Sequence, residues 1–129
     1  MTYINKKEVY YHSLNSPLYG GVQDQNKNSI FVLGGNASTA GDRVYLSKNY
    51  LKGDTFRVLY IGPSNTSMDI RIPSGCSIYS SYGNVSNSGS DYNTSLNVTR
   101  YSMIALVCIS AVFDGSGNYV SSVWRQMFV

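Results

Sequence analysis

The sequence predicts an all-β fold, in the form of an antiparallel β-sandwich or a jelly-roll-like domain with a C-terminal hairpin. Three observations lead to this prediction. About eight or nine short apolar or alternating segments are separated by turns rich in Gly, Asn, Asp and Ser. No window of about eleven residues has the apolar spacing of an amphipathic helix. Residues 101–113 are apolar on both faces of an extended strand, which is typical of a strand covered on both sides.

Residues 1–28 carry the weakest signals. Residues 9–12 have the composition of one strand, and residues 23–28 have that of a polar loop. We expect residues 1–28 to be an N-terminal connecting segment and residues 29–129 to form one β-sandwich domain. A chain of 129 residues can bury one hydrophobic core but not two.

Five predicted strands follow between residues 29 and 82. Each has apolar residues in a run or at alternate positions, and each is followed by a turn that contains Gly or Pro. Alternation indicates a strand with one face toward the core, because successive side chains point to opposite faces. The five segments are residues 29–34, 43–47, 55–62, 68–72 and 76–82.

Residues 83–93 form the one long irregular stretch that the sequence predicts. Such a connection of about eleven residues exceeds the usual length of about 4–6, and long loops are often functional. Residues 95–99 then alternate again and return the chain to a sheet.

The C-terminal hairpin consists of residues 101–113 and 119–129, joined by a loop whose two glycines allow positive φ angles. We expect residues 101–113 to be the central strand of a sheet or to close against another copy of the chain. Strict alternation places the side chains of Met103, Ala105, Val107, Ile109, Ala111 and Phe113 on one face and those of Ile104, Leu106, Cys108 and Val112 on the other.

Charge and hydropathy exclude several classes of function. The ten Lys and Arg residues are scattered, so the sequence lacks the clustered cations of a nucleic-acid-binding surface. The longest apolar run, residues 104–109, is far shorter than the about 18–20 residues of a membrane span. We therefore expect neither nucleic-acid binding nor membrane insertion. We interpret Cys76 and Cys108 as buried hydrophobic residues in preference to a disulfide.

No pattern in the sequence indicates catalysis or metal binding. His12 is the only histidine, so imidazole catalysis and a zinc site would both depend on it. Asp114, Ser116 and Asn118 place oxygens at alternate positions, but no acidic residue follows to complete a calcium site. We expect a protein that is not an enzyme and that uses no cofactor or metal.

The twelve tyrosines favour a binding role, because tyrosine combines an apolar ring with a hydroxyl group. Several of them flank the polar stretch 83–93, where rings can stack on a neutral sugar and amides can recognise its hydroxyl groups. The alternative is that Tyr79 and Tyr82 pack across strands and that the stretch is only solvated. The candidate ligand-binding residues are Tyr79, Ser81, Tyr82, Asn84, Asn87, Asp91, Tyr92 and Asn93.

Residues 29–38 (SIFVLGGNAS), followed by residues 41–46 (GDRVYL), consist of an apolar strand, a Gly-Gly turn and a second strand. This pattern resembles the short β-repeats near the distal ends of bacteriophage tail fibres and tailspikes. The remainder, rich in Tyr, Ser, Asn and Gly, is similar to their tip domains. The resemblance implies a homotrimeric β-sandwich tip on the virion that contacts a bacterial surface glycan or outer-membrane receptor outside the cell. It carries over no binding residue, because tip loops differ between fibres.

The leading hypothesis is therefore a non-enzymatic receptor-binding or adhesion tip domain of a phage fibre-like trimer. A structural capsid-decoration or fibre-assembly domain is the first alternative, since apolar strands can serve subunit contacts alone. A monomeric lectin-like carbohydrate-binding module is the second. Oligomeric state and glycan binding distinguish the three hypotheses.

Overall fold

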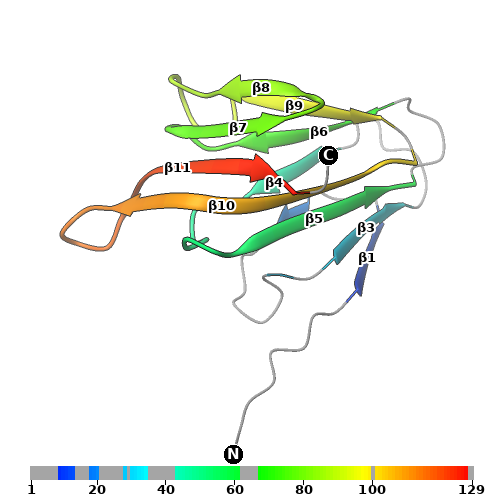
Figure 1. Ribbon diagram of the computed structural model, residues 1–129, viewed down its shortest axis with the longest axis horizontal. Helices are drawn as coiled ribbons and strands as arrows, with labels where there is room; N and C mark the ends of the chain where they lie inside the picture. Colours follow the sequence, from blue (N-terminus) through cyan, green and yellow to red (C-terminus); the bar gives the residue numbers. More distant parts are fainter. Residues whose placement is uncertain are drawn as a thin grey trace, which may run out of the picture.

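The computed structural model describes residues 9–13, 18–20, 28, 30–34, 43–61, 67–99 and 101–127. Strands and turns make up these residues, which confirms the predicted all-β class (Figure 1). They include no helix of the length and apolarity that a membrane crossing needs. The strands are β1 (Val9–Ser13), β2 (Leu18–Gly20), β3 (Ile30–Gly34), β4 (Arg43–Leu46), β5 (Thr55–Tyr60), β6 (Ser67–Ile72), β7 (Cys76–Ser80), β8 (Gly83–Ser86), β9 (Thr94–Thr99), β10 (Met103–Phe113) and β11 (Tyr119–Gln126).

The strands form two sheets. The larger sheet has the order β1-β3-β5-β10-β11-β7-β8, and the smaller sheet has the order β2-β4-β6-β9. Strands β1 and β2 come from the predicted connecting segment, and they pair with β3 and β4. The rest of residues 1–28 apart from Asn28, together with residues 29, 35–42, 62–66, 100 and 128–129, lies outside the described residues. The turns expected at 36–42 and 62–65 fall in this part.

The prediction of antiparallel sheets is wrong, because both sheets are mixed. Strands β1, β3 and β5 run parallel in the larger sheet, and β2, β4 and β6 run parallel in the smaller one. From β1 to β6 the chain alternates between the two sheets. Each connection reverses the direction of the chain, and each sheet receives every second strand. Two reversals separate neighbouring strands of one sheet, so these strands run parallel. Turn signals indicate a reversal, but they do not indicate which sheet the next strand joins.

One hydrophobic core joins the two sheets. Strands β4, β5 and β6 show the alternating burial that their sequences predict, with every second side chain buried. The buried cluster consists of Phe31, Val44, Leu46, Tyr50, Phe56, Val58, Tyr60, Met68, Ile70, Ile72, Cys76, Ile78, Leu96, Val98, Ile104, Leu106, Cys108 and Trp124. Because these residues come from both sheets, the inner faces of the sheets share this core.

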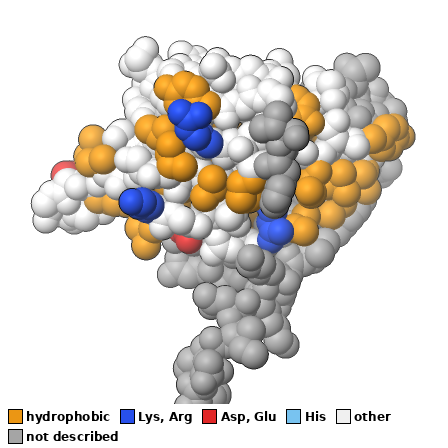
Figure 2. Space-filling view, in the orientation of Figure 1, with side chains coloured by type: hydrophobic (Ala, Val, Ile, Leu, Met, Phe, Trp, Pro, Cys, Tyr) orange, Lys and Arg blue, Asp and Glu red, His pale blue; other side chains and the backbone are white. Residues whose placement is uncertain are grey.

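Strand β10 lies at the centre of the larger sheet between β5 and β11, as one of the two predicted alternatives requires. Its inner face is buried, but Met103 on the outer face is 47% exposed. Neighbours within the single chain therefore cover one face of β10 more completely than the other. Figure 2 shows hydrophobic side chains gathered over β10 and β5 on this outer face.

Strict alternation along β10 is wrong beyond Cys108. The pairing with β11 shifts register between Cys108 and Ser110, which marks a β-bulge. The extra residue reverses the phase of the strand, so that Ala111 packs against the core and Val112 is exposed. Cys108 and Val112, which were predicted to share one face, therefore lie on opposite faces of the sheet.

The irregular stretch predicted at residues 83–93 is shorter in the structure. Residues 83–86 form β8 and pair with β7, so the irregular stretch begins at Asn87. The predicted strand 76–82 ends at Ser80, and Ser81 and Tyr82 form the turn between β7 and β8.

Cys76 and Cys108 are free and buried, which confirms their interpretation as core residues. Burial raises the pKa of the Cys76 thiol to about 12.

Candidate functional site

The predicted ligand-binding residues separate into two groups. Tyr79, Ser81 and Asn84 come together in a shallow pocket of about 290 Å³, here called the Tyr79 pocket. Its other lining residues are Ser80, Arg125 and Gln126. The pocket lies where the β7–β8 hairpin meets the C-terminal end of β11.

The β7–β8 turn positions two of the pocket residues. The hydroxyl of Ser80 donates to the carbonyl of Gly83 at 2.7 Å, and the amide of Ser80 donates to Oδ1 of Asn84 at 3.2 Å. Gly83 has a φ of 126°, which L-residues with a side chain rarely adopt. The sequence Ser-Ser-Tyr-Gly-Asn therefore closes a tight turn and holds Asn84 beside Ser80.

Pairing between β7 and β11 provides the rest of the pocket. Arg125 is in register with Tyr79 in the parallel pair, and its Cζ lies 5.1 Å from the centre of the Tyr79 ring. This is the geometry of a cation–π interaction. The next residue, Gln126, accepts hydrogen bonds through Oε1 from the amide of Ser81 at 2.7 Å and from its hydroxyl at 2.8 Å.

The pocket is cationic. Arg125 is exposed and forms no ion pair within the described part of the chain. None of the lining residues is acidic. A guanidinium group in this position can donate two parallel hydrogen bonds to a carboxylate. The Tyr79 ring already restricts the orientation of the guanidinium group, so less conformational entropy is lost when a ligand binds.

Asp91, Tyr92 and Asn93 form the second group, in the loop between β8 and β9. The Asp91 carboxylate pairs with the ammonium group of Lys48 and accepts a hydrogen bond from the amide of Ser74 at 2.9 Å. The hydrogen bond from Lys48 is the main cause that lowers the pKa of Asp91, and the Ser74 amide adds to it. Both carboxylate oxygens of Asp91 are therefore engaged within the chain.

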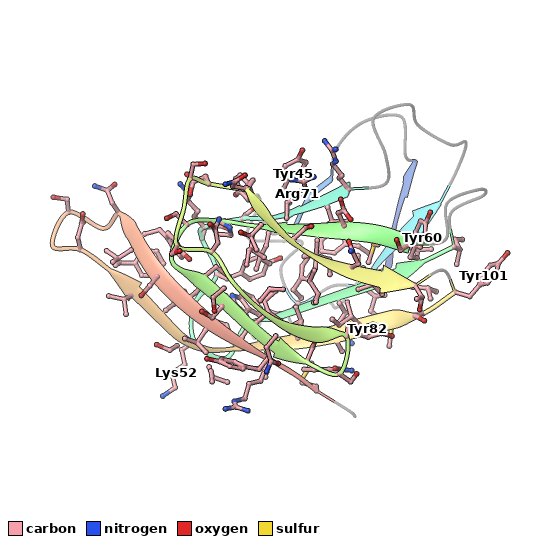
Figure 3. All side chains as sticks on the ribbon, turned by 90° about the horizontal axis from the view of Figure 1, so that it is seen from above. Tyr45, Lys52, Tyr60, Arg71, Tyr82 and Tyr101 are labelled. Atoms are coloured by element: carbon pink, nitrogen blue, oxygen red, sulfur yellow. The ribbon has the colours of Figure 1, made fainter. Side chains whose placement is uncertain are left out.

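Tyr92 ties the same loop to the smaller sheet. Its hydroxyl donates to the carbonyl of Leu46 at 3.0 Å, and its ring meets that of Tyr45 edge-on at 5.2 Å. Asn93 donates its backbone amide to Ser90. Figure 3 shows Tyr45 on the side of the molecule that carries the smaller sheet, away from Tyr82. The second group thus contacts the smaller sheet through Tyr92 and shares no residue with the Tyr79 pocket.

Asn87 and Tyr82 are structural in this fold. Asn87 is 3% exposed, and its side-chain nitrogen donates to the carbonyls of Ile72 at 3.0 Å and Ser90 at 2.9 Å. Its Oδ1 accepts from the amide of Gly89 at 2.9 Å. Tyr82 packs against the hydrophobic core. Neither side chain lies in the Tyr79 pocket.

Three pocket residues were not included in the sequence prediction: Ser80, which adjoins the predicted Tyr79 and Ser81, and Arg125 and Gln126 on β11. The signal for Arg125 and Gln126 was that they are two of the polar residues in the half-polar C-terminal strand. That signal did not indicate a site, because Arg125 is 46 positions away from Tyr79 and only the β7–β11 pairing brings them together.

Within the described residues no group of three His, Cys, Asp or Glu side chains is placed to hold a metal ion. Comparison of the chain with protein-family models, with curated proteins and with solved structures found no match.

Proposed function

We propose that the chain is a non-enzymatic adhesion domain that binds an acidic surface glycan in the Tyr79 pocket. The observation that carries this proposal is the exposed guanidinium group of Arg125, held against Tyr79 in a pocket without acidic residues. The ligand expected from the tyrosines alone was a neutral sugar. The cationic pocket favours a sugar with a carboxylate, such as a uronic acid.

The pocket offers a different partner for each part of such a ligand. Arg125 pairs with the carboxylate in a bidentate manner, and the amide of Asn84 and the hydroxyl of Ser81 face the sugar hydroxyl groups. Tyr79 remains 40% exposed although Arg125 lies over its ring, so part of the ring can contact the apolar edge of the sugar.

Assembly is the second part of the proposal. Val32, Leu59 and Met103 are in register across β3, β5 and β10 and form an uncharged row on the outer face of the larger sheet. Such a row, exposed at Met103, is suited to contact the same row on another copy of the chain. We propose a homotrimeric β-sandwich tip, consistent with attachment of a phage fibre to a bacterial surface.

A glycan array that carries bacterial oligosaccharides, with and without carboxyl groups, tests the binding proposal. We expect binding to acidic glycans and loss of it when their carboxylates are reduced to alcohols. Arg125→Gln should weaken binding about 10- to 100-fold, because a hydrogen-bonded charge pair contributes about 1.5–3 kcal/mol. Arg125→Lys should retain only part of the affinity, since lysine lacks the planar fork.

Lys52→Gln is the matched control, because it removes one exposed positive charge that does not line the pocket. Equal losses in Arg125→Gln and Lys52→Gln would reduce the effect to net charge and contradict the pocket. Equal binding to the acidic and carboxyl-reduced glycans would contradict the ligand class.

The row on the outer face also favours a second candidate function, that of an assembly domain without a ligand. Light scattering on the purified chain tests the contact between copies. We expect a trimer for the natural sequence and a monomer for Met103→Lys, because a charge would be buried in the contact. A trimer that binds no glycan would favour assembly alone, and a monomeric natural chain would contradict the contact.

A further inference from the structure

The inward direction of Phe113 follows from the β-bulge in β10. The register shift between Cys108 and Ser110 moves Ala111 onto the core side, and Phe113 follows it by two positions. Phe113 is the register partner of Tyr119 on β11, and their rings meet edge-on at 6.2 Å. A second register shift, between Val112 and Phe113, makes Tyr119 and not Val120 the partner of Phe113, so the two irregularities together set two aromatic rings side by side at the end of the hairpin.

The hairpin extends past the shared core. Figure 1 shows the β10–β11 hairpin projecting to one side of both sheets. Neither Phe113 nor Tyr119 belongs to the buried cluster, although Ala111 packs against it. The two rings therefore continue the inner face of the larger sheet beyond the point where the smaller sheet covers it.

Residues 47–49, which follow β4, lie across from these two rings. Together with the hairpin they line an open, shallow depression of about 440 Å³, here called the hairpin cleft. It is lined by Ser47, Lys48, Asn49, Phe113, Gly117, Asn118 and Tyr119. Its volume lies in the range of about 300–1,000 Å³ of small-molecule sites.

The walls of the hairpin cleft combine aromatic and polar groups without a surplus of charge. Phe113 and Tyr119 present rings, and Ser47, Asn49 and Asn118 contribute polar side chains. Lys48 is the charged residue of the lining, and its ammonium group is already paired with Asp91. Hydrogen bonds stabilise the β10–β11 turn at the rim of the cleft, because the Asp114 carboxylate accepts from the amides of Ser116 and Asn118, both at 2.9 Å.

We propose that the hairpin cleft is a second carbohydrate site, which takes one neutral sugar residue. A pyranose has an apolar face that stacks on aromatic rings and hydroxyl groups that pair with amides and hydroxyls. The pairing of Lys48 with Asp91 disfavours an anionic ligand, in contrast to the Tyr79 pocket, whose Arg125 forms no ion pair among the residues that the structure describes. The site does not depend on the proposed function, because the two pockets share no lining residue.

The chain has a built-in reporter for the hairpin cleft. Trp124 is the only tryptophan, and its Nε1 donates to Oγ of Ser122 at 3.2 Å. The same Oγ lies 3.0 Å from the hydroxyl of Tyr119, which lines the cleft. On the opposite wall, Asn49 precedes Tyr50, whose ring meets Trp124 edge-on at 5.1 Å. A ligand that moves either wall should therefore shift the indole N–H resonance.

The experiment is an NMR titration of the full chain with three neutral sugars, methyl α-glucoside, methyl β-galactoside and N-acetylglucosamine, and with glucuronic acid. We expect at least one neutral sugar to cause saturable shifts in residues 47–49 and 113–119 and in the Trp124 indole. Glucuronic acid should shift these residues less at the same concentration. No saturable shift in the cleft with any neutral sugar, or a stronger response to glucuronic acid, would overturn the proposal.

Variants of the hairpin separate this site from the Tyr79 pocket. Phe113→Ala should weaken binding about tenfold, the loss expected from removing a stacking ring, and Phe113→Tyr should bind normally. Val112→Ala is the matched control, because Val112 is the adjacent residue and is 46% exposed on the opposite face. Unchanged binding in Phe113→Ala, or equal losses in both alanine variants, would contradict the cleft. Arg125→Gln should leave these neutral-sugar shifts unchanged, even if the proposed function proves wrong.

Discussion

The indole Nε1 of Trp124 donates a hydrogen bond to Oγ of Ser122, 3.2 Å away, inside the hydrophobic core. The hydroxyl of Tyr119 meets the same oxygen at 3.0 Å. Burial raises the pKa of Tyr119 to about 12, so its hydroxyl stays protonated at neutral pH. A small buried serine thus satisfies the polar atoms of two aromatic residues on β11.

Replacing Ser122 with alanine should destabilise the fold by about 1–3 kcal/mol, because the buried indole N–H would lose its acceptor. Urea unfolding followed by Trp124 emission measures this loss. Ser121→Ala is the control and should change the stability by less than about 0.5 kcal/mol. Equal stabilities of the two variants would show that the Ser122 hydroxyl is not needed in the core.

Gly75 should tolerate alanine much less well than Gly53. Both have a positive φ, 80° for Gly75 and 92° for Gly53, which costs an L-residue about 1–2 kcal/mol. A Cβ at Gly75 would also lie 2.5 Å from the backbone oxygen of Val120, whereas nothing lies within 4 Å of a Cβ at Gly53. We expect a loss of about 3 kcal/mol or more for Gly75→Ala, against about 1–2 for Gly53→Ala. Chemical denaturation compares them, and equal losses would contradict the close approach of the two backbones.

Asn87 and Asn84 should respond differently to alanine, although both were candidate ligand-binding residues. Asn87→Ala removes three hydrogen bonds of a buried amide and should cost about 1–3 kcal/mol of stability. Asn84→Ala should cost less than about 0.5 kcal/mol, since water can replace the exposed hydrogen bond from Ser80. Thermal unfolding measures both. A more destabilising Asn84→Ala would reverse the structural and ligand-binding roles assigned here.

Asp91 should make the stability depend on pH in the acidic range. Its pKa in the folded chain lies below the ordinary value of 3.8, so the unfolded chain takes up a proton first as the pH falls. The stabilisation is therefore complete above the ordinary pKa and is lost as the pH decreases through the folded value. Asp91→Asn should flatten this dependence when urea midpoints are compared between about pH 6 and about pH 2.

Lys48→Gln should flatten the same pH dependence in part, because the hydrogen bond from Lys48 is the main cause of the lowered pKa and the Ser74 amide remains. An unchanged pH dependence in Asp91→Asn would show that other carboxylates control acid unfolding.

Alternation within single strands was the most reliable signal in the sequence. The buried positions of β5 are Phe56, Val58 and Tyr60, as the period of two predicts. Such a prediction needs no knowledge of the neighbours, because the pleat of a strand alone sends successive side chains to opposite faces. It fails on β10 beyond Cys108, where a bulge adds one residue and reverses the phase.

Pairing between distant strands was not predictable in the same way. Short turns reverse the chain, but they do not state whether the next strand joins the same sheet or the opposite one. The alternation of β1 to β6 between the sheets therefore escaped the sequence prediction, and so did the parallel pairing of β7 with β11. Tyr79 was a candidate on its composition and position alone, whereas its partner Arg125 was not.

The sequence by itself determined the all-β class, most strand positions, the inward faces of the regular strands and the burial of the two cysteines. These depend on the period of two and on turn chemistry, which act over a few residues. Only the tertiary structure decided which strands pair, where the bulge falls and hence which side chains form the Tyr79 pocket and the hairpin cleft. Those choices depend on hydrogen bonds and packing between segments far apart in the chain, which no local pattern encodes.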